Sequence, residues 1–328
     1  MKVTIYEVAK EAGLSIATVS RYINKKGGIS SKSEAKIVDA IQKLHYVPDA
    51  SAQSLAMGLS GTVGVQMGNQ ALESHYFHQF LTGVSRAVMG EGFDLLLTQM
   101  EGDCFSACNS VLTRKKMDGI IFPAPSDREK EYLKLLYEKE FPVCYAGARY
   151  EWDKRRSHVY GGYTAYRKEL MELMIRKNCR RILWLELDEN GLKKTEKIIR
   201  GCSQPKVFLP LLETSHMTSD DVYHLVLEKL EEKDRPDSIF FANPEFAGFI
   251  YAAAGEAGLQ IPKDLKLISM IHSVQQDKLF TPNLSVIYLD AYQMGYQAGK
   301  KICALIQKND MKPEWDMVPY EIWENETI

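Results

Sequence analysis

Residues 61–328 alternate between short apolar runs and longer segments with helical periodicity, and this alternation limits the folds that the chain can adopt. Strand-like runs cover 63–67, 93–98, 119–122, 143–146, 181–185, 207–209, 238–242, 267–270 and 286–288. Helix-like segments cover 77–90, 129–139, 164–177, 219–232, 245–257 and 291–307. Strands and helices in alternation indicate parallel sheets covered by helices.

The N-terminal 47 residues have a different pattern, that of three short helices. Thr4 and Glu7 form a capping box for the first helix, and Gly13 stands where a helix-ending glycine belongs. Ser15 can cap a second helix two residues later. The third helix is predicted to begin with a capping box at 31–34 and to end before Pro48.

Two short helices joined by a tight turn, with a third helix supporting them, indicate a helix-turn-helix unit. The second helix of such a unit enters the DNA major groove, and its N-terminal side chains reach the base edges. Ile16 and Ala17 point away from the predicted core position Val19. They are either scattered surface residues or contacts for a thymine methyl group. Arg21 suits a guanine edge or a phosphate.

Charge is distributed unevenly along the chain, whose formal net charge is −2. Residues 1–60 hold eight lysines and arginines against five aspartates and glutamates, a net charge of +3. The remaining residues therefore carry −5. A basic head on an acidic body suggests that only the head meets a polyanion.

The N-terminal pattern resembles the lac-repressor (LacI/GalR) family of bacterial transcription regulators. The residues that carry the resemblance are Thr4–Ala12, Gly13–Arg21 and Tyr46–Asp49, and it extends more loosely through the whole chain. The resemblance implies a sequence-specific DNA-binding regulator. The DNA-binding residues that we expect are Thr4, Tyr6, Ser15, Ile16, Ala17, Thr18, Ser20, Arg21, Asn24, Ser30, Tyr46, Ala52, Gln53 and Leu55.

Residues 49–58 form a short segment of small residues between Asp49 and Gly58. A helix of ten residues is marginal alone. In the family this segment is a hinge helix that forms on DNA, where Leu55 would wedge into a minor-groove step and Ala52 would allow two hinge helices to pack. The alternative interpretation is a flexible linker with one exposed leucine.

The body resembles the family's core, a type I periplasmic-binding-protein-like fold with two α/β lobes and parallel sheets. The resemblance implies a helix-turn-helix domain (1–47), a hinge (48–60), a first lobe (61–156 plus 288–318) and a second lobe (157–287 plus 319–328). An effector would lie between the lobes, at the carboxyl ends of the strands. The candidate effector-binding residues are Asn69, Tyr76, Phe77, Ser126, Arg149, Tyr160, Asn243 and His272.

Several positions depart from the family's sugar-binding pattern. Gly147, Ile198 and Leu289 replace polar or charged residues of many members, and 160–161 and 272–273 read Tyr-Gly and His-Ser in place of Asp-Asn and Asp-Asp. Carboxylates and arginines hold sugar hydroxyls and anions. Their loss argues against an ordinary hexose effector. An aromatic or less polar ligand is favoured by the residues present, which fit equally well a pocket that binds nothing, namely Tyr76, Phe77, Tyr160, His272 and Asn243.

We therefore expect a homodimeric regulator that binds a pseudo-palindromic double-stranded DNA operator and is controlled by a small-molecule effector. Because repression is the usual mode of the family, we expect a repressor. The alternative is the same regulator controlled by a protein partner or by no ligand. An enzyme is not expected, because nucleotide-binding, metalloprotease and nucleophile-elbow motifs are absent from the sequence. No cofactor, metal or membrane partner is expected, and the expected location is the cytoplasm, on the nucleoid.

Overall fold

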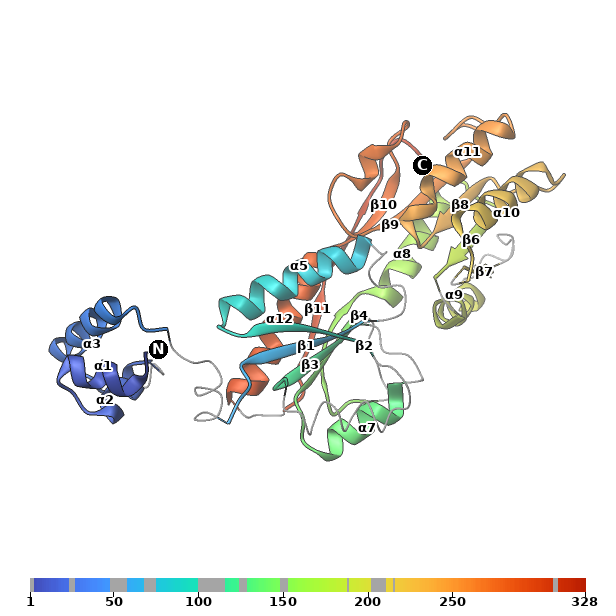
Figure 1. Ribbon diagram of the computed structural model, residues 1–328. Coiled ribbons are helices and arrows are strands. Elements are labelled where there is room, and N and C mark those ends of the chain that lie inside the picture. Colours follow the sequence, from blue (N-terminus) through green and yellow to red (C-terminus); the bar gives the residue numbers. More distant parts are fainter. Residues whose placement is uncertain are drawn as a thin grey trace. The chain divides into compact units, whose positions relative to one another are not determined.

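The computed structural model describes residues 3–23, 27–47, 58–67, 75–99, 116–123, 129–147, 153–187, 189–201, 211–214, 216–308 and 312–328. The chain divides into two compact units, one of which contains the N-terminal helices and the other the two sheets (Figure 1). Within the described residues, no helix combines the length and the apolar character needed to cross a membrane.

The N-terminal unit contains three helices, α1 (Ile5–Ala12), α2 (Ile16–Ile23) and α3 (Ser31–Leu44). The predicted capping box of Thr4 and Glu7 is present, and Gly13 ends α1 in the left-handed conformation at φ 62°. The start of α3 was predicted one residue too late, because Ser30, and not Ser31, caps it by accepting the Ser33 N–H. The helix ends at Leu44, before Pro48, because His45 adopts a left-handed conformation.

The core of this unit is small and built from one face of each helix. Val8 of α1, Val19 of α2 and Ile37 of α3 are fully buried, and Ala9, Ala12 and Ala40 complete the cluster. The buried positions within each helix follow the helical spacing that the sequence shows.

The first sheet of the body has six strands in the order β11-β5-β4-β3-β1-β2. The strands from β11 across to β1 all pair in parallel. Its strands are β1 (Thr62–Met67), β2 (Asp94–Gln99), β3 (Gly119–Pro123), β4 (Val143–Gly147), β5 (Ser157–Gly161) and β11 (Trp315–Val318). The helices of this lobe are α5 (His75–Gly90), α7 (Lys130–Glu138) and α12 (Ala291–Lys308).

The second sheet also has six strands, in the order β12-β10-β9-β8-β6-β7. Its pairings are parallel except that β12 runs antiparallel to β10. Its strands are β6 (Ile182–Glu186), β7 (Leu211–Glu213), β8 (Ser238–Phe241), β9 (Lys266–Ile271), β10 (Ser285–Leu289) and β12 (Tyr320–Trp323). The helices are α8 (Tyr163–Arg176), α9 (Glu189–Gly201), α10 (Ser219–Glu231) and α11 (Ala247–Glu256), with 3-10 turns η3 (Pro244–Phe246) and η4 (Gln276–Leu279).

The predicted fold class, a helical head and a two-lobed body with parallel sheets, is confirmed. The details of the lobe crossings need correction. Residues 157–161 were predicted to open the second lobe, but they form β5 and pair with β4 in the first sheet. Residues 288–289 were predicted to belong to the first lobe, but they lie in β10 of the second sheet. The predicted strand 207–209 lies outside the described residues.

Helices α5 and α12 pack closely in the first lobe (Figure 1). A Cβ atom on Gly83 would lie 2.0 Å from the Tyr292 carbonyl oxygen, and one on Gly295 would lie 1.9 Å from the Phe80 carbonyl oxygen. Because both neighbours are backbone atoms, these positions accept only glycine without movement of a helix. This seam fixes α12, and therefore the chain's return from the second lobe, against α5.

Candidate nucleic-acid interface

The start of helix α2 is fixed by a local hydrogen-bond network. The Ser15 Oγ accepts the Thr18 N–H at 3.2 Å, and the two hydroxyl oxygens lie 2.8 Å apart. This arrangement holds the first turn of α2 in place, which a helix that reads bases with its N-terminal residues requires.

The faces of α2 differ in burial. Val19 is fully buried, whereas Ile16 is 42% exposed and Ala17 and Arg21 are also exposed. Tyr6 on α1 is 67% exposed. An exposed isoleucine and an exposed arginine on a short capped helix have the chemistry for a thymine methyl group and for a guanine edge or phosphate, respectively.

The other predicted contacts are distributed around this face. The Thr4 hydroxyl and N–H both donate to Glu7, at 3.1 and 2.7 Å, so this side chain serves the cap of α1. Ser30 caps α3 differently, because its Oγ accepts the Ser33 N–H at 3.3 Å. Thr18, Ser20 and Tyr46 are half-buried. Four further predicted residues lie outside the described residues, namely Asn24, Ala52, Gln53 and Leu55.

In the body, part of the predicted effector group gathers where strands β8 and β9 end. The rings of Tyr76 and His272 meet edge to face with their centres 4.7 Å apart. The His272 Nδ1 lies 3.3 Å from the Leu289 carbonyl oxygen, which can only accept, so this nitrogen carries the proton. Burial lowers the pKa of His272 to about 4, and its ring is therefore neutral at pH 7.

Three residues that we did not select join this group. The His75 Nε2 lies 2.8 Å from the Ser273 Oγ, and the His75 N–H donates to Glu245 at 3.4 Å. Asn243 in turn accepts the Glu245 N–H at 3.1 Å. The first turn of α5 in one lobe therefore contacts two loops of the other lobe. The sequence indicated a place for His75 and Ser273 in this group only because they adjoin the predicted residues Tyr76 and His272.

The remaining predicted effector residues are not brought into this group by the described contacts. Phe77 lies in the hydrophobic core of the first lobe with Phe80, and core packing explains its side chain. Tyr160 lies in β5, in register with Gly147 and Met317. Asn69, Ser126 and Arg149 lie outside the described residues. Within the described ranges, no three histidine, cysteine or acidic side chains gather to hold a metal ion.

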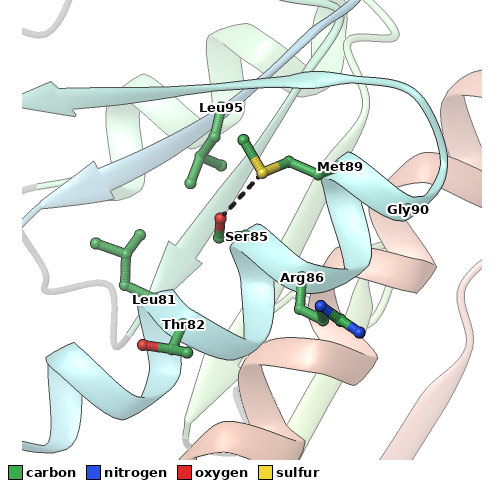
Figure 2. Close-up of a pocket in the computed structure, with 7 residues that line it drawn as sticks. All are labelled: Leu81, Thr82, Ser85, Arg86, Met89, Gly90 and Leu95. Carbon is green, nitrogen blue, oxygen red and sulfur yellow. Dashed lines mark hydrogen bonds between the residues drawn. The ribbon is translucent and has the colours of Figure 1, made fainter.

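The outer face of α5 forms an open hollow of about 800 Å³ with strand β2 (Figure 2). Leu81, Met89 and Leu95 supply apolar surface to it, and Met89 is 63% exposed. Thr82, Ser85 and Arg86 also line it, and the Ser85 hydroxyl donates to the Met89 sulfur at 3.5 Å. Exposed apolar surface of this kind is typical of a protein–protein contact.

The helix-turn-helix unit, with its exposed α2 face, and the two-lobed α/β body together have the architecture of a DNA-binding transcription regulator. Residues 4–49 match the model of bacterial regulatory proteins of the lacI family, and residues 204–328 match a periplasmic binding protein-like domain. The chain therefore has the helix-turn-helix domain of the lacI family followed by a periplasmic binding protein-like domain.

Relatives and solved structures agree with this assignment. Catabolite control protein A of Staphylococcus xylosus is 27% identical over 329 residues, and that of Priestia megaterium 26% over 333 residues; each match covers 98% of both chains. The Lac repressor dimer bound to operator and the anti-inducer ONPF superposes with a TM-score of 0.80 at 20% identity, covering 100% of this chain and 99% of that one. The CelR–cellobiose complex gives 0.69 at 18% identity, with both chains fully covered.

Proposed function

We propose that this regulator binds a pseudo-palindromic operator as a homodimer and represses transcription from it, on the nucleoid in the cytoplasm. Two copies of α2 would read half-sites in major grooves about 34 Å apart. The observation that carries the proposal is the burial pattern of α2, which packs Val19 inward and presents Ile16, Ala17 and Arg21 to solvent.

The operator contacts that we propose form two groups. Base and phosphate contacts come from Thr4, Tyr6, Ser15, Ile16, Ala17, Thr18, Ser20, Arg21, Asn24, Ser30 and Tyr46. Minor-groove contacts come from Ala52, Gln53 and Leu55 in the hinge, residues 48–60. Selection of duplexes from a random pool by the full chain tests this proposal. A recovered pseudo-palindrome supports it, and a pool without sequence enrichment contradicts it.

The hinge assignment has its own test, the variant Leu55→Ala. A leucine wedge unstacks and bends the DNA, and the extra contacts that the bend allows offset the cost of unstacking. Loss of the wedge should therefore weaken binding to the selected duplex. The thermal midpoint of the body should stay unchanged. An operator affinity equal to that of the wild type would contradict the hinge assignment.

Exposed apolar side chains on the body support the homodimer. They occur on the α5 face with Met89 and again in the second lobe, where Phe249, Val274 and Leu279 are 39%, 63% and 73% exposed. Exposed apolar surface that is contiguous, as on the α5 face, is typical of a contact surface. The Lac repressor, which shares the fold, is described as a dimer.

We further propose that an effector acts between the two lobes. The predicted lobe bounds are 61–156 plus 288–318 and 157–287 plus 319–328, except that β5 belongs to the first lobe and β10 to the second. We assign Tyr76, Asn243 and His272 to the effector site. The further candidates are Tyr160 in β5 and three residues outside the described ranges, namely Asn69, Ser126 and Arg149. Two structures of this fold contain a bound small molecule, cellobiose in CelR and ONPG in the Lac repressor.

A regulator controlled by a protein partner, or by no ligand, is the second candidate. The contacts of His75 with Ser273 and of Tyr76 with His272 favour it, because they join the lobes through the chain's own side chains. A thermal-shift screen of the full chain against sugars, sugar phosphates, nucleosides and aromatic metabolites separates the candidates. A ligand at about 100 times its dissociation constant adds about 2.7 kcal/mol of stability. A flat screen favours the second candidate.

A further inference from the structure

Asp118 holds the segment by which the chain enters the body. Its carboxylate accepts three successive backbone N–H groups, from Ser60 and Gly61 at 2.7 Å each and from Thr62 at 3.2 Å. The Asp118 N–H donates to the Thr62 carbonyl oxygen at 2.8 Å. Thr62 opens β1, and Asp118 directly precedes β3, the strand that pairs with β1.

The conformation of Gly61 makes this arrangement possible. Its φ of +75° lies in the left-handed region, which favours glycine. Successive residues that alternate in handedness turn their N–H groups toward one point and form a nest for an anion. Here the Asp118 carboxylate is the anion, and hydrogen bonds to a charged acceptor are stronger than neutral ones.

The second lobe repeats this arrangement at the corresponding strands. The Asp237 carboxylate accepts the Arg180 and Arg181 N–H groups at 2.9 and 3.1 Å, and the Asp237 N–H donates to the Arg181 carbonyl oxygen at 2.9 Å. Asp237 directly precedes β8, which pairs with β6 just as β3 pairs with β1. The contact is therefore a general way to fix the start of the first strand in each lobe.

The two copies differ in what precedes them. The chain before Arg180 comes from α8, a helix that packs within the same lobe. The chain before Ser60 comes from the helix-turn-helix unit. The same hydrogen bonds thus fix an internal connection in the second lobe and the attachment point of the DNA-binding unit in the first.

We propose that Asp118 is a positioning residue for operator binding, because it fixes the point and direction from which the DNA-linked segment leaves the body. A tether with a fixed origin raises the effective concentration of the second head at its half-site once the first is bound. If the start of the tether is less firmly held, this effective concentration falls, although no DNA contact is removed. The proposal rests on the DNA-binding function of the head.

The matched variants Asp118→Asn and Asp237→Asn test this role in the full-length protein. Each replaces one carboxylate oxygen with a donor that repels the backbone N–H, and each costs its lobe a comparable set of hydrogen bonds. The probe is the duplex that the wild-type chain selects from a random pool. We expect Asp118→Asn to weaken binding by about tenfold or more, within the usual range of coupling between sites. Asp237→Asn should leave the operator affinity within about twofold of the wild type, although its thermal midpoint should fall about as much as that of Asp118→Asn.

Equal operator affinities for the two variants, after correction for active protein, would overturn the proposal and leave Asp118 a structural anchor only. If Asp118→Asn does not fold, Gly61→Ala strains the same nest while Asp118 stays in place, and unchanged affinity in that variant would overturn the proposal too. A wild-type chain that selects no duplex would remove the DNA-binding function itself, so the two failures are distinguishable.

Discussion

His272 is buried beside Tyr76, His75 and the loop of Ser273, and its ring must stay neutral there. Its pKa in the folded chain is about 4 against an ordinary value of 6.5, so the unfolded chain binds the proton more readily in this range. The contribution of His272 to the free energy of unfolding should therefore be constant well above pH 6.5 and fall by about 3 kcal/mol as the pH drops to 4.

The variant His272→Asn tests this pH dependence. Its amide N–H can still donate to the Leu289 carbonyl oxygen, but it has no proton to bind at pH 4 to 6.5. Denaturant unfolding measured at intervals across this range should give a shallower slope for the variant than for the wild type. Parallel slopes would show that His272 does not control the acid sensitivity.

Single residues were predictable where their chemistry is local. Thr4, Gly13 and Ser15 occupy the cap positions that the sequence predicts, because a cap depends on residues three or four apart. The pair His75 and Ser273 was not predictable, because 198 residues separate them. Phe77 was wrongly predicted to be a pocket residue, because the core in which it packs is built from strands and helices distant in sequence.

Helices α5 and α12 depend on glycine for their close packing. Gly83→Ala should lower the free energy of unfolding by about 1–3 kcal/mol, because its methyl group would lie 2.0 Å from the Tyr292 carbonyl oxygen. Gly255→Ala in α11 is the matched control, since nothing lies within 4 Å of its added Cβ, and it should be neutral or stabilising. Urea unfolding measures both, and equal midpoints for the two variants would contradict the packing argument.

Elements with a strong apolar pattern were predictable, and polar ones were not. Helix α9 was missed because its sequence is dominated by lysine, glutamate and other polar residues. Strands β11 and β12 are only four residues each and largely exposed or half-buried, so they lack the apolar run that marks a buried strand. Strand β5 was assigned to the wrong lobe because sheet membership depends on pairing with β4.

At the scale of the whole molecule, the proposed dimer makes the α5 face testable. Met89→Lys places a second cation beside Arg86 on that face, and each partner would present the same charges. We expect the dimer dissociation constant to rise about tenfold or more, since burying an unpaired charge is costly. Leu187→Lys, at a 43% exposed position in the second lobe, is the control. Sedimentation equilibrium measures the dimer dissociation constants of both variants. If both equal the wild-type value, the α5 face is not the dimer interface.

The central claim is that α2 reads operator DNA, and the most direct test is the affinity of Arg21→Ala for the duplex selected by the wild type. Arg200→Ala serves as the control, because its side chain is 82% exposed on α9 of the body. We expect a loss of about 1–3 kcal/mol of binding free energy for Arg21→Ala and none for Arg200→Ala. Equal affinities for the wild type and both variants would contradict the assignment of α2 as the recognition helix.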